Sequence, residues 1–185
     1  ALLSRLAAFR SLDGGYDATP NAERGTVYGC FLALGAHQDL DAALPDPDRM
    51  LDCLNALQAE DGGFANQADM PAGLTPPTAA AVTLLRQLEQ PRRPELADWL
   101  LSRCHPEGGF FATPLAPIPD LLSTATALHA LAGMQVSLDP IKEPCLDFLD
   151  TLWSSKGAFY GNWADDELDC EYTYYALLCL GHLSL

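Results

Sequence analysis

The sequence has little positive charge. Lys and Arg together number 10 of 185 residues, and only Lys142 and Lys156 are lysines. Asp and Glu number 25, which gives a net charge of −15 at pH 7. A surface this acidic repels the phosphates of nucleic acids and of anionic lipids. We therefore expect neither nucleic acid nor a membrane surface as a partner.

Long apolar runs are also missing. Stretches such as residues 176–185 are much shorter than the ~20 apolar residues that span a bilayer, so we expect no transmembrane segment. The first six residues are too short an apolar run for a secretory signal and lack an initiator Met. We therefore expect a cytoplasmic protein, and a chain that is a fragment of a longer one. The six cysteines include no C-x-x-C pair, which favours reduced thiols in the core.

Signals for β-strands are sparse, and a fourfold repeat predicts the fold instead. Short turn motifs begin at Asp13, Asp61, Glu107 and Lys156, 46 to 49 residues apart, and each contains glycine before an aromatic residue. Apolar residues at helical spacing precede and follow every motif. We predict an all-α fold of four helical hairpins, in which glycine caps the first helix of each hairpin.

The second helix of each repeat is in register with its motif. Thr78, Thr124 and Thr173 each lie 15 residues after the second small residue of the motif, and in the first repeat we expect Val27 as the equivalent. The repeats cover about residues 1–43, 44–90, 91–139 and 140–185 of a single domain. Because each repeat contacts its neighbours, we expect a curved array with inner and outer layers of helices.

Residues 57–64, Leu-Gln-Ala-Glu-Asp-Gly-Gly-Phe, resemble the Q-x-x-D-G-G-F signature of the prenyltransferase and terpene-cyclase α/α-toroid superfamily. Residues 117–124 and 169–175 are similar to the starts of its inner helices, and the resemblance extends through all four repeats. It implies an α/α toroid, a barrel that the family closes with about six hairpins. Four hairpins then make an incomplete barrel, which missing repeats or a second subunit would complete.

The resemblance also implies a metal site where the inner helices begin. The family's zinc ligands are an Asp, a Cys two residues later and a His from the next repeat. Asp169 matches the Asp, Glu171 stands at the Cys position, and the His is absent. Oxygen ligands suit Zn²⁺ and Mg²⁺, so we expect either metal on these two residues. Residues 165–169 also match the D-D-x-x-D pattern of other isoprenoid enzymes, and the alternative is a solvated loop in which Asp169 caps the helix.

The ligand that the resemblance implies is an isoprenoid diphosphate or another apolar small molecule. The resemblance makes Tyr172 and Asp169 the candidate catalytic residues, because the family's tyrosine reaches toward the diphosphate. Residues 161–163, Gly-Asn-Trp, stand where the family has a basic residue. The candidate substrate-binding residues are aromatic or acidic: Tyr28, Phe31, Asp120, Trp163, Tyr174 and Tyr175. The alternative is packing between helix layers for the aromatic residues, and an N-cap for Asp120.

Three functions are compatible with these residues. The first is a prenyltransferase-like transferase that binds an isoprenoid diphosphate in an aromatic-lined cavity. The missing zinc cysteine and the missing basic residues favour a second, a non-catalytic toroid that binds a protein or a carbohydrate. The third is a glycan-active toroid in which Asp120 and Asp169 act as acid and base, which requires carboxyl groups within about 10 Å.

Overall fold

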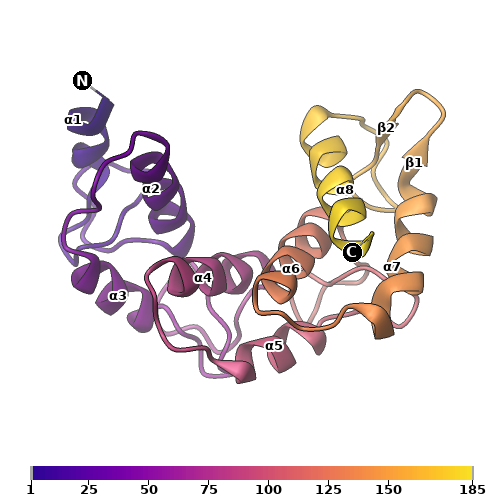
Figure 1. Cartoon of the computed structure of the whole chain (residues 1–185), viewed down its shortest axis with the longest axis horizontal. Coiled ribbons are helices and arrows are strands. Elements are labelled where there is room, and N and C mark those ends of the chain that lie inside the picture. Colours follow the sequence, from indigo (N-terminus) through magenta and orange to yellow (C-terminus); the bar gives the residue numbers. More distant parts are fainter. Residues whose placement is uncertain (1, 185) are drawn as a thin grey trace. The chain divides into compact units, whose positions relative to one another are not determined.

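The computed structural model describes residues 2–184, which are mostly helical (Figure 1). The elements in chain order are α1 (Leu2–Leu6), the 3₁₀ helix η1 (Ala7–Phe9), α2 (Val27–Asp39), α3 (Pro47–Ala56), α4 (Thr75–Gln87), α5 (Pro94–Leu101), α6 (Leu121–Gly133), α7 (Asp139–Leu152), β1 (Trp153–Ser154), β2 (Ala158–Phe159) and α8 (Cys170–Leu183). The prediction of an all-α fold is confirmed, with one pair of two-residue strands. None of the helices described in residues 2–184 is long and apolar enough to cross a bilayer.

The contacts of the chain divide it into two compact units, Ala1–Arg92 and Arg93–Leu185. Each unit corresponds to two of the four repeats. In the first unit, α2 packs against α4. In the second unit, α6 packs against α8, and α8 also contacts α7. The helices that follow the turn motifs therefore pair with each other within each unit, as the repeat predicts. The single domain of four repeats stays a prediction.

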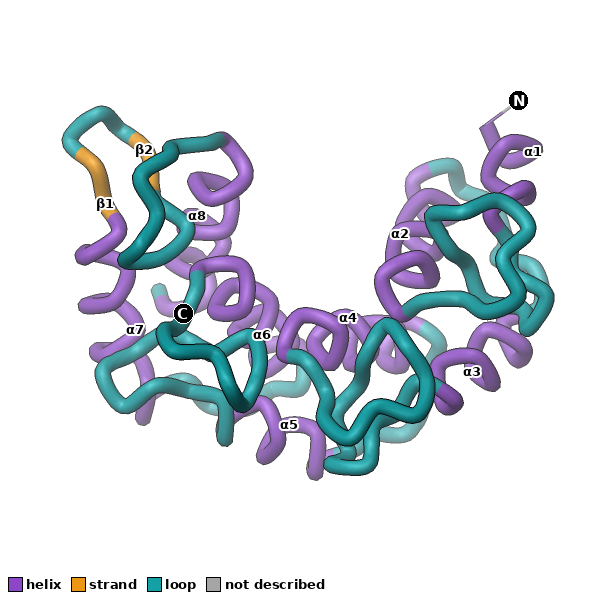
Figure 2. The backbone as a smooth tube through the Cα atoms, turned by 180° about the vertical axis from the view of Figure 1, so that it is seen from behind, coloured by secondary structure: helices purple, strands orange, loops and turns teal. Residues whose placement is uncertain are grey.

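The turn motifs do not cap helices, so that prediction was wrong. α3 and α5 end several residues before their motifs, and each motif instead closes a narrow hairpin. Gln58 pairs with Phe64 in the second repeat, and in the fourth repeat the pairing of Trp153 with Phe159 extends to β1 and β2 (orange in Figure 2). Gly62 has a φ of +88°, a backbone conformation that suits a residue without a Cβ. Glycine therefore reverses the chain here rather than ending a helix.

The aromatic residue of each motif is buried, and in the second and third repeats its backbone N–H joins the turn to the following helix. The Phe64 N–H donates to Thr78 Oγ1 at 2.8 Å, and the Phe110 N–H donates to Thr124 Oγ1 at 2.9 Å. All four residues are fully buried. The 15-residue spacing thus has a physical reason, since the threonine hydroxyl satisfies a backbone donor that no water reaches.

In the first repeat, the equivalent of these threonines is Cys30 and not Val27. The Thr26 N–H donates to the Tyr16 carbonyl at 2.8 Å, a bond that the residue four before the threonine makes in the second and third repeats. Cys30 follows Thr26 by four residues and lies 15 residues after Gly15, so the first loop is not shorter. The prediction failed because apolar residues at i, i+3 and i+4 give the same pattern after a shift of one turn.

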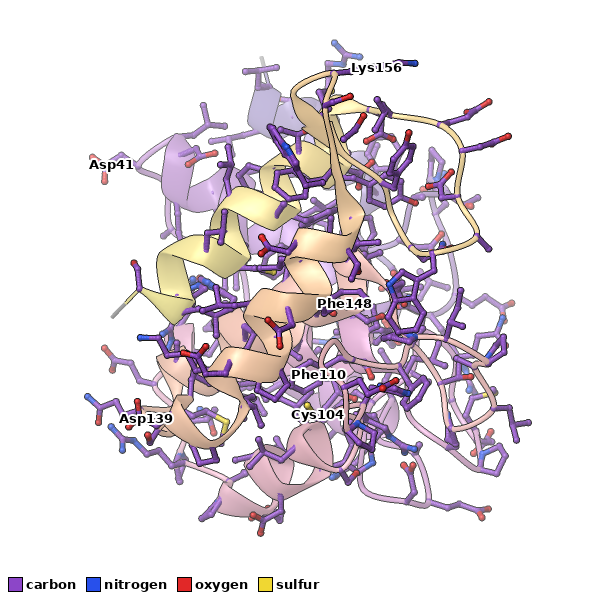
Figure 3. The ribbon with its side chains drawn as sticks, turned by 90° about the vertical axis from the view of Figure 1, so that its right-hand side faces the viewer. Asp41, Cys104, Phe110, Asp139, Phe148 and Lys156 are labelled. Carbon is purple, nitrogen blue, oxygen red and sulfur yellow. The ribbon has the colours of Figure 1, made fainter. Side chains whose placement is uncertain are left out.

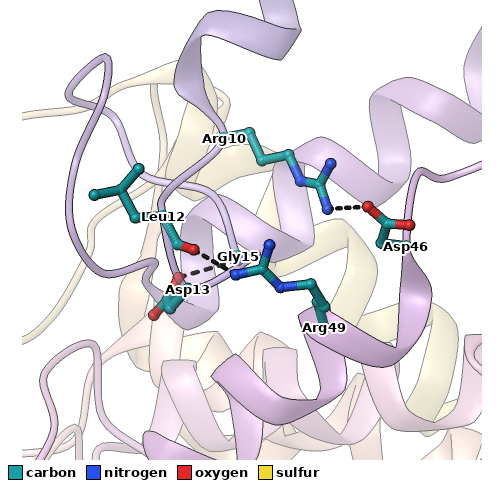
Figure 4. Close-up of polar contacts among 6 residues, drawn as sticks. All are labelled: Arg10, Leu12, Asp13, Gly15, Asp46 and Arg49. Atoms are coloured by element: carbon teal, nitrogen blue, oxygen red, sulfur yellow. Dashed lines mark hydrogen bonds and ion pairs between the residues drawn. The ribbon is translucent and has the colours of Figure 1, made fainter.

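Polar contacts join the first two repeats inside the first unit (Figure 4). Arg10 forms an ion pair with Asp46 at 2.6 Å, and Arg49 donates to the carbonyl of Leu12. The motif carboxylate of Asp13 accepts hydrogen bonds from backbone amides on both sides of its loop. The bonds of Arg10 and Arg49 tie the turn of the first repeat to the start of α3 in the second repeat.

Part of the core of the second unit lies between its first turn motif, which begins at Glu107, and α7. Phe110 and Phe148 are both buried there (Figure 3). Phe148 packs so closely on Gly109 that an added Cβ would lie 3.0 Å from its ring. All six cysteines have free thiols; four are buried, whereas Cys104 is partly exposed and Cys170 is exposed.

Candidate functional site

The candidate site lies at the N-terminal ends of α6 and α8 in the second unit. Asp120 caps α6, where its Oδ1 accepts from the Ser123 N–H at 2.7 Å. Asp169 caps α8, where its Oδ1 accepts from the Tyr172 N–H at 2.8 Å. Carboxylates at these positions satisfy free backbone donors and interact favourably with the helix dipole. The N-cap interpretation is therefore confirmed for both residues.

The loop between β2 and α8 connects the two helix starts. The Leu121 N–H, in the first turn of α6, donates to the Gly161 carbonyl at 2.8 Å. The Gly161 N–H donates to Asp165 Oδ2 at 3.1 Å, and Asp165 Oδ1 accepts from the Glu167 N–H. Residues 165–169 lie in this loop and end at the cap of α8, so the D-D-x-x-D match does not place its carboxylates along one helix face.

Tyr172 is the centre of this group. Its ring packs on Gly161, where an added Cβ would lie 2.3 Å from the ring carbon Cζ. The pKa of Tyr172 is raised, first by burial and then by neighbouring carboxylates. Those carboxylates belong to Asp165, Asp169, Asp120 and Glu171. The structure thus brings four of the sequence-predicted site residues together.

Two further residues belong to the site. Gly161 supports the Tyr172 ring, and sequence reasoning assigned it no site role. Asp165 accepts from the Gly161 and Glu167 N–H groups, and sequence reasoning considered it only as part of the D-D-x-x-D match. The available signal was the absence of a side chain at Gly161, where the family has a basic residue. Only a glycine leaves room for the ring at this position.

Asp120 is a partly buried carboxyl group of the site. Burial raises its pKa above the value of 3.8 for a solvated Asp, while hydrogen bonds from the Ser123 backbone and hydroxyl lower it. The burial effect is larger. Asp120 therefore holds a proton more readily than a solvated Asp does.

The aromatic residues predicted for substrate binding lie on different parts of the second unit and on α2 of the first unit. Tyr174 is exposed on α8 and contacts the ring of Tyr175, whose hydroxyl donates to Glu171 Oε1 at 3.1 Å. Trp163 packs on the outer helix α7 instead, where its indole N–H donates to Thr151 Oγ1 at 2.8 Å. Its ring also meets Phe148 edge-on at 5.6 Å between ring centroids.

Tyr28 and Phe31 belong to the first unit. Both lie on α2, with exposed fractions of 58% and 38%, next to the exposed Leu32. The Tyr28 backbone N–H donates to Asn66 Oδ1 at 3.1 Å. These residues make an exposed apolar face on α2.

The donor atoms near Tyr172 do not fit a zinc site with three protein ligands. Within residues 2–184, no three His, Cys, Asp or Glu side chains are arranged to hold a metal ion. Asp169 and Glu171 each already use one carboxylate oxygen in a hydrogen bond. Their remaining oxygens suit Mg²⁺, which is held by one or two carboxylates together with phosphate oxygens and water.

Comparisons with known proteins agree with the fold. The family model described as the prenyltransferase alpha-alpha toroid domain matches residues 78–184. Among solved structures, the chain is similar to a chain of Candida albicans protein geranylgeranyltransferase-I complexed with GGPP, with a TM-score of 0.70 and 20% identity. The match covers 92% of this chain and 51% of that chain, so this chain spans about half of the neighbour's length. No curated protein sequence matches the chain significantly.

Proposed function

We propose that this chain, which belongs to the prenyltransferase alpha-alpha toroid domain family, binds an isoprenoid diphosphate. The observation that carries the proposal is an apolar row on α8, within the matched domain. Tyr174, Leu177 and Leu180 recur there every three residues and are 60%, 60% and 37% exposed. Adjacent exposed apolar side chains mark a binding surface for an apolar ligand. The likeness to a structure that contains GGPP supports this ligand class.

The diphosphate group would lie beside Tyr172, at the same end of α8 as Tyr174. The charged side chains that raise the pKa of Tyr172 are all acidic. They repel an anionic ligand unless a cation is bound with it. Mg²⁺ associates with diphosphates and accepts carboxylate ligands, for which Asp169 and Glu171 are the candidates. We therefore expect binding that depends on Mg²⁺ and does not require zinc.

Calorimetric titration with farnesyl diphosphate and with farnesol separates the two parts of the proposal. Farnesyl diphosphate should bind in the presence of Mg²⁺ and more weakly without it. The double variant Tyr172→Ala, Asp169→Ala should abolish binding of the diphosphate but not of farnesol. Leu177→Asp should weaken both ligands, because it places a charge in the apolar row.

Leu115→Asp is the matched control, because Leu115 is a 93% exposed leucine in a loop of the same unit. It should leave both affinities unchanged. Absence of farnesyl diphosphate binding in the presence of Mg²⁺ would remove the proposal. Equal losses in Leu115→Asp and Leu177→Asp would remove α8 as the binding surface.

A second candidate function is binding without prenyl transfer. The observation that favours it is that the charged side chains which raise the pKa of Tyr172 are all acidic, and none of them offers a cation to a departing diphosphate. A transfer assay with a thiol peptide and farnesyl diphosphate decides between the two. Binding without transfer, at saturating Mg²⁺ and Zn²⁺, would support a binding module.

A further inference from the structure

Two histidines face each other between α6 and α8. His129 Nδ1 lies 3.1 Å from His182 Nε2, and the ring centroids are 5.1 Å apart with planes at 60°. The two residues are 53 positions apart in the sequence and come from the two helices that pack together in the second unit. Both side chains are partly exposed, so an ion from solvent can reach them.

The repeat does not require histidine at either position. His129 lies five residues after Thr124, and the corresponding residue of the second repeat is Thr83. The Thr83 hydroxyl donates to the carbonyl of Ala79 in its own helix at 3.1 Å. His182 lies nine residues after its register threonine, and Gly133 holds that position in α6. Each histidine thus stands where another repeat has a different residue, so the repeat pattern does not account for the pair.

We propose that His129 and His182 form a binding site for a divalent transition-metal ion that links α6 to α8. Metal–imidazole nitrogen bonds are about 2.0–2.1 Å long, so two nitrogens 3.1 Å apart subtend about 100° at a shared ion. This angle lies between the ~90° of square-planar sites and the ~109° of tetrahedral sites. Zn²⁺, Ni²⁺ and Cu²⁺ are the divalent ions that imidazole ligands suit.

A shared metal changes where the protons of the pair lie, because each ligating imidazole nitrogen must carry no proton. Without metal, the N–H of one ring donates a hydrogen bond to the ring nitrogen of the other. A shared metal replaces that hydrogen bond with two coordinate bonds, and the N–H proton of the donor ring moves through solvent to the other nitrogen of the same ring, so both rings stay neutral.

The site is separate from the group around Tyr172. His182 lies 13 residues after Asp169 along α8, which is about 20 Å at 1.5 Å per residue. Cys179 is one turn before His182, but it is fully buried and its burial raises the pKa of the thiol, so it stays protonated. Since residues 2–184 contain no cluster of three metal-binding side chains, water completes the coordination.

Zinc binding can be measured by calorimetry and by thermal unfolding of the whole chain. The background should carry Cys170→Ser, because the exposed Cys170 thiol could bind zinc beside Asp169. We expect one Zn²⁺ per chain and a melting temperature that rises with zinc concentration. His129→Gln and His182→Gln should each weaken zinc binding at least about tenfold, since losing a ligand costs at least as much affinity as losing a residue that hydrogen-bonds to a ligand.

His105→Gln is the matched control, because His105 is a partly exposed histidine of the same unit. It should retain the zinc response of the background. Equal zinc affinity in His182→Gln and the background would overturn the proposal, as would no binding in the background. Far-UV circular dichroism establishes that each variant is folded.

Electron paramagnetic resonance with Cu²⁺ gives a direct readout of the ligands. The spectrum of the background should show coupling to two nitrogens, and that of His129→Gln to one. Coupling unchanged by either substitution would place copper elsewhere and overturn the assignment. Because neither experiment uses an isoprenoid, its result is independent of the function proposed above.

Discussion

Asp120 combines two opposing effects in one side chain. Its carboxylate caps α6 and accepts two hydrogen bonds from Ser123, which favours the charged form. Its burial favours the neutral form and is the larger effect, so the pKa is raised. A group whose pKa is higher in the folded state binds more protons there than in the unfolded chain. The stability it contributes therefore falls as the pH rises through this range.

Asp120→Asn should remove this pH dependence. Asn caps helices about as well as Asp, and it carries no charge that burial penalises. We expect the free energy of unfolding of the variant to equal or exceed that of the wild type at pH 7. As the pH rises from 3.8, the ordinary pKa of a solvated Asp, to neutral pH, the wild type should lose stability relative to the variant.

Urea unfolding at pH 4 and pH 7 measures the effect. Asp169→Asn is the matched control, because it changes the exposed cap of α8 in the same way. A wild type that gains stability relative to Asp120→Asn between pH 4 and pH 7 would contradict this account of Asp120.

At the scale of the element, hydrogen bonds to the preceding turn motif hold α6 in place. In the third repeat, the Asp120 N–H donates to the Phe110 carbonyl, while Thr124 Oγ1 accepts from the Phe110 N–H. These two bonds set both the start and the rotation of α6. The same threonine hydroxyl also donates to the carbonyl of Asp120 at 2.6 Å.

Thr124→Val should lower the free energy of unfolding by about 1–3 kcal/mol, because it leaves the buried Phe110 N–H without an acceptor. Valine has nearly the same shape, so the loss measures the hydrogen bond and not a cavity. Thr126→Val is the control, since the partly exposed Thr126 hydroxyl donates to carbonyls of its own helix and holds no buried N–H of a turn. Similar losses in both variants, measured in urea, would contradict this role of Thr124.

At the scale of the whole molecule, the net charge of −15 opposes folding. Carboxylates are closer to one another in a folded chain than in an unfolded one, so their repulsion destabilises the compact state. Salt reduces this repulsion, because the Debye length falls from about 30 Å at 0.01 M to about 10 Å at 0.1 M.

That a second subunit completes the barrel stays a prediction.

Sodium chloride should therefore stabilise the protein. We expect the melting temperature to rise between 0.01 M and 0.15 M salt, by about 2–4 °C for each kcal/mol of repulsion removed. Differential scanning calorimetry measures this shift. A melting temperature that falls with salt would show that favourable ion pairs outweigh the repulsion.

The sequence determined the repeated architecture, because apolar spacing and turn glycines are local properties of the chain. It placed Thr78 and Thr124 in register before their hydrogen bonds were known. It failed at Val27, since a shift of one turn leaves a helical apolar pattern intact. It also assigned the glycines to helix caps, because a positive φ occurs both in caps and in tight hairpins.

The tertiary structure decided which side chains meet. Tyr172 and Asp120 are joined through the Gly161 loop, and His129 meets His182 across two packed helices. No local pattern encodes such distances, because they depend on how helices far apart in the sequence are rotated against each other. Periodicity thus specified the helices and short motifs such as residues 57–64 carried the family resemblance, whereas packing specified the site.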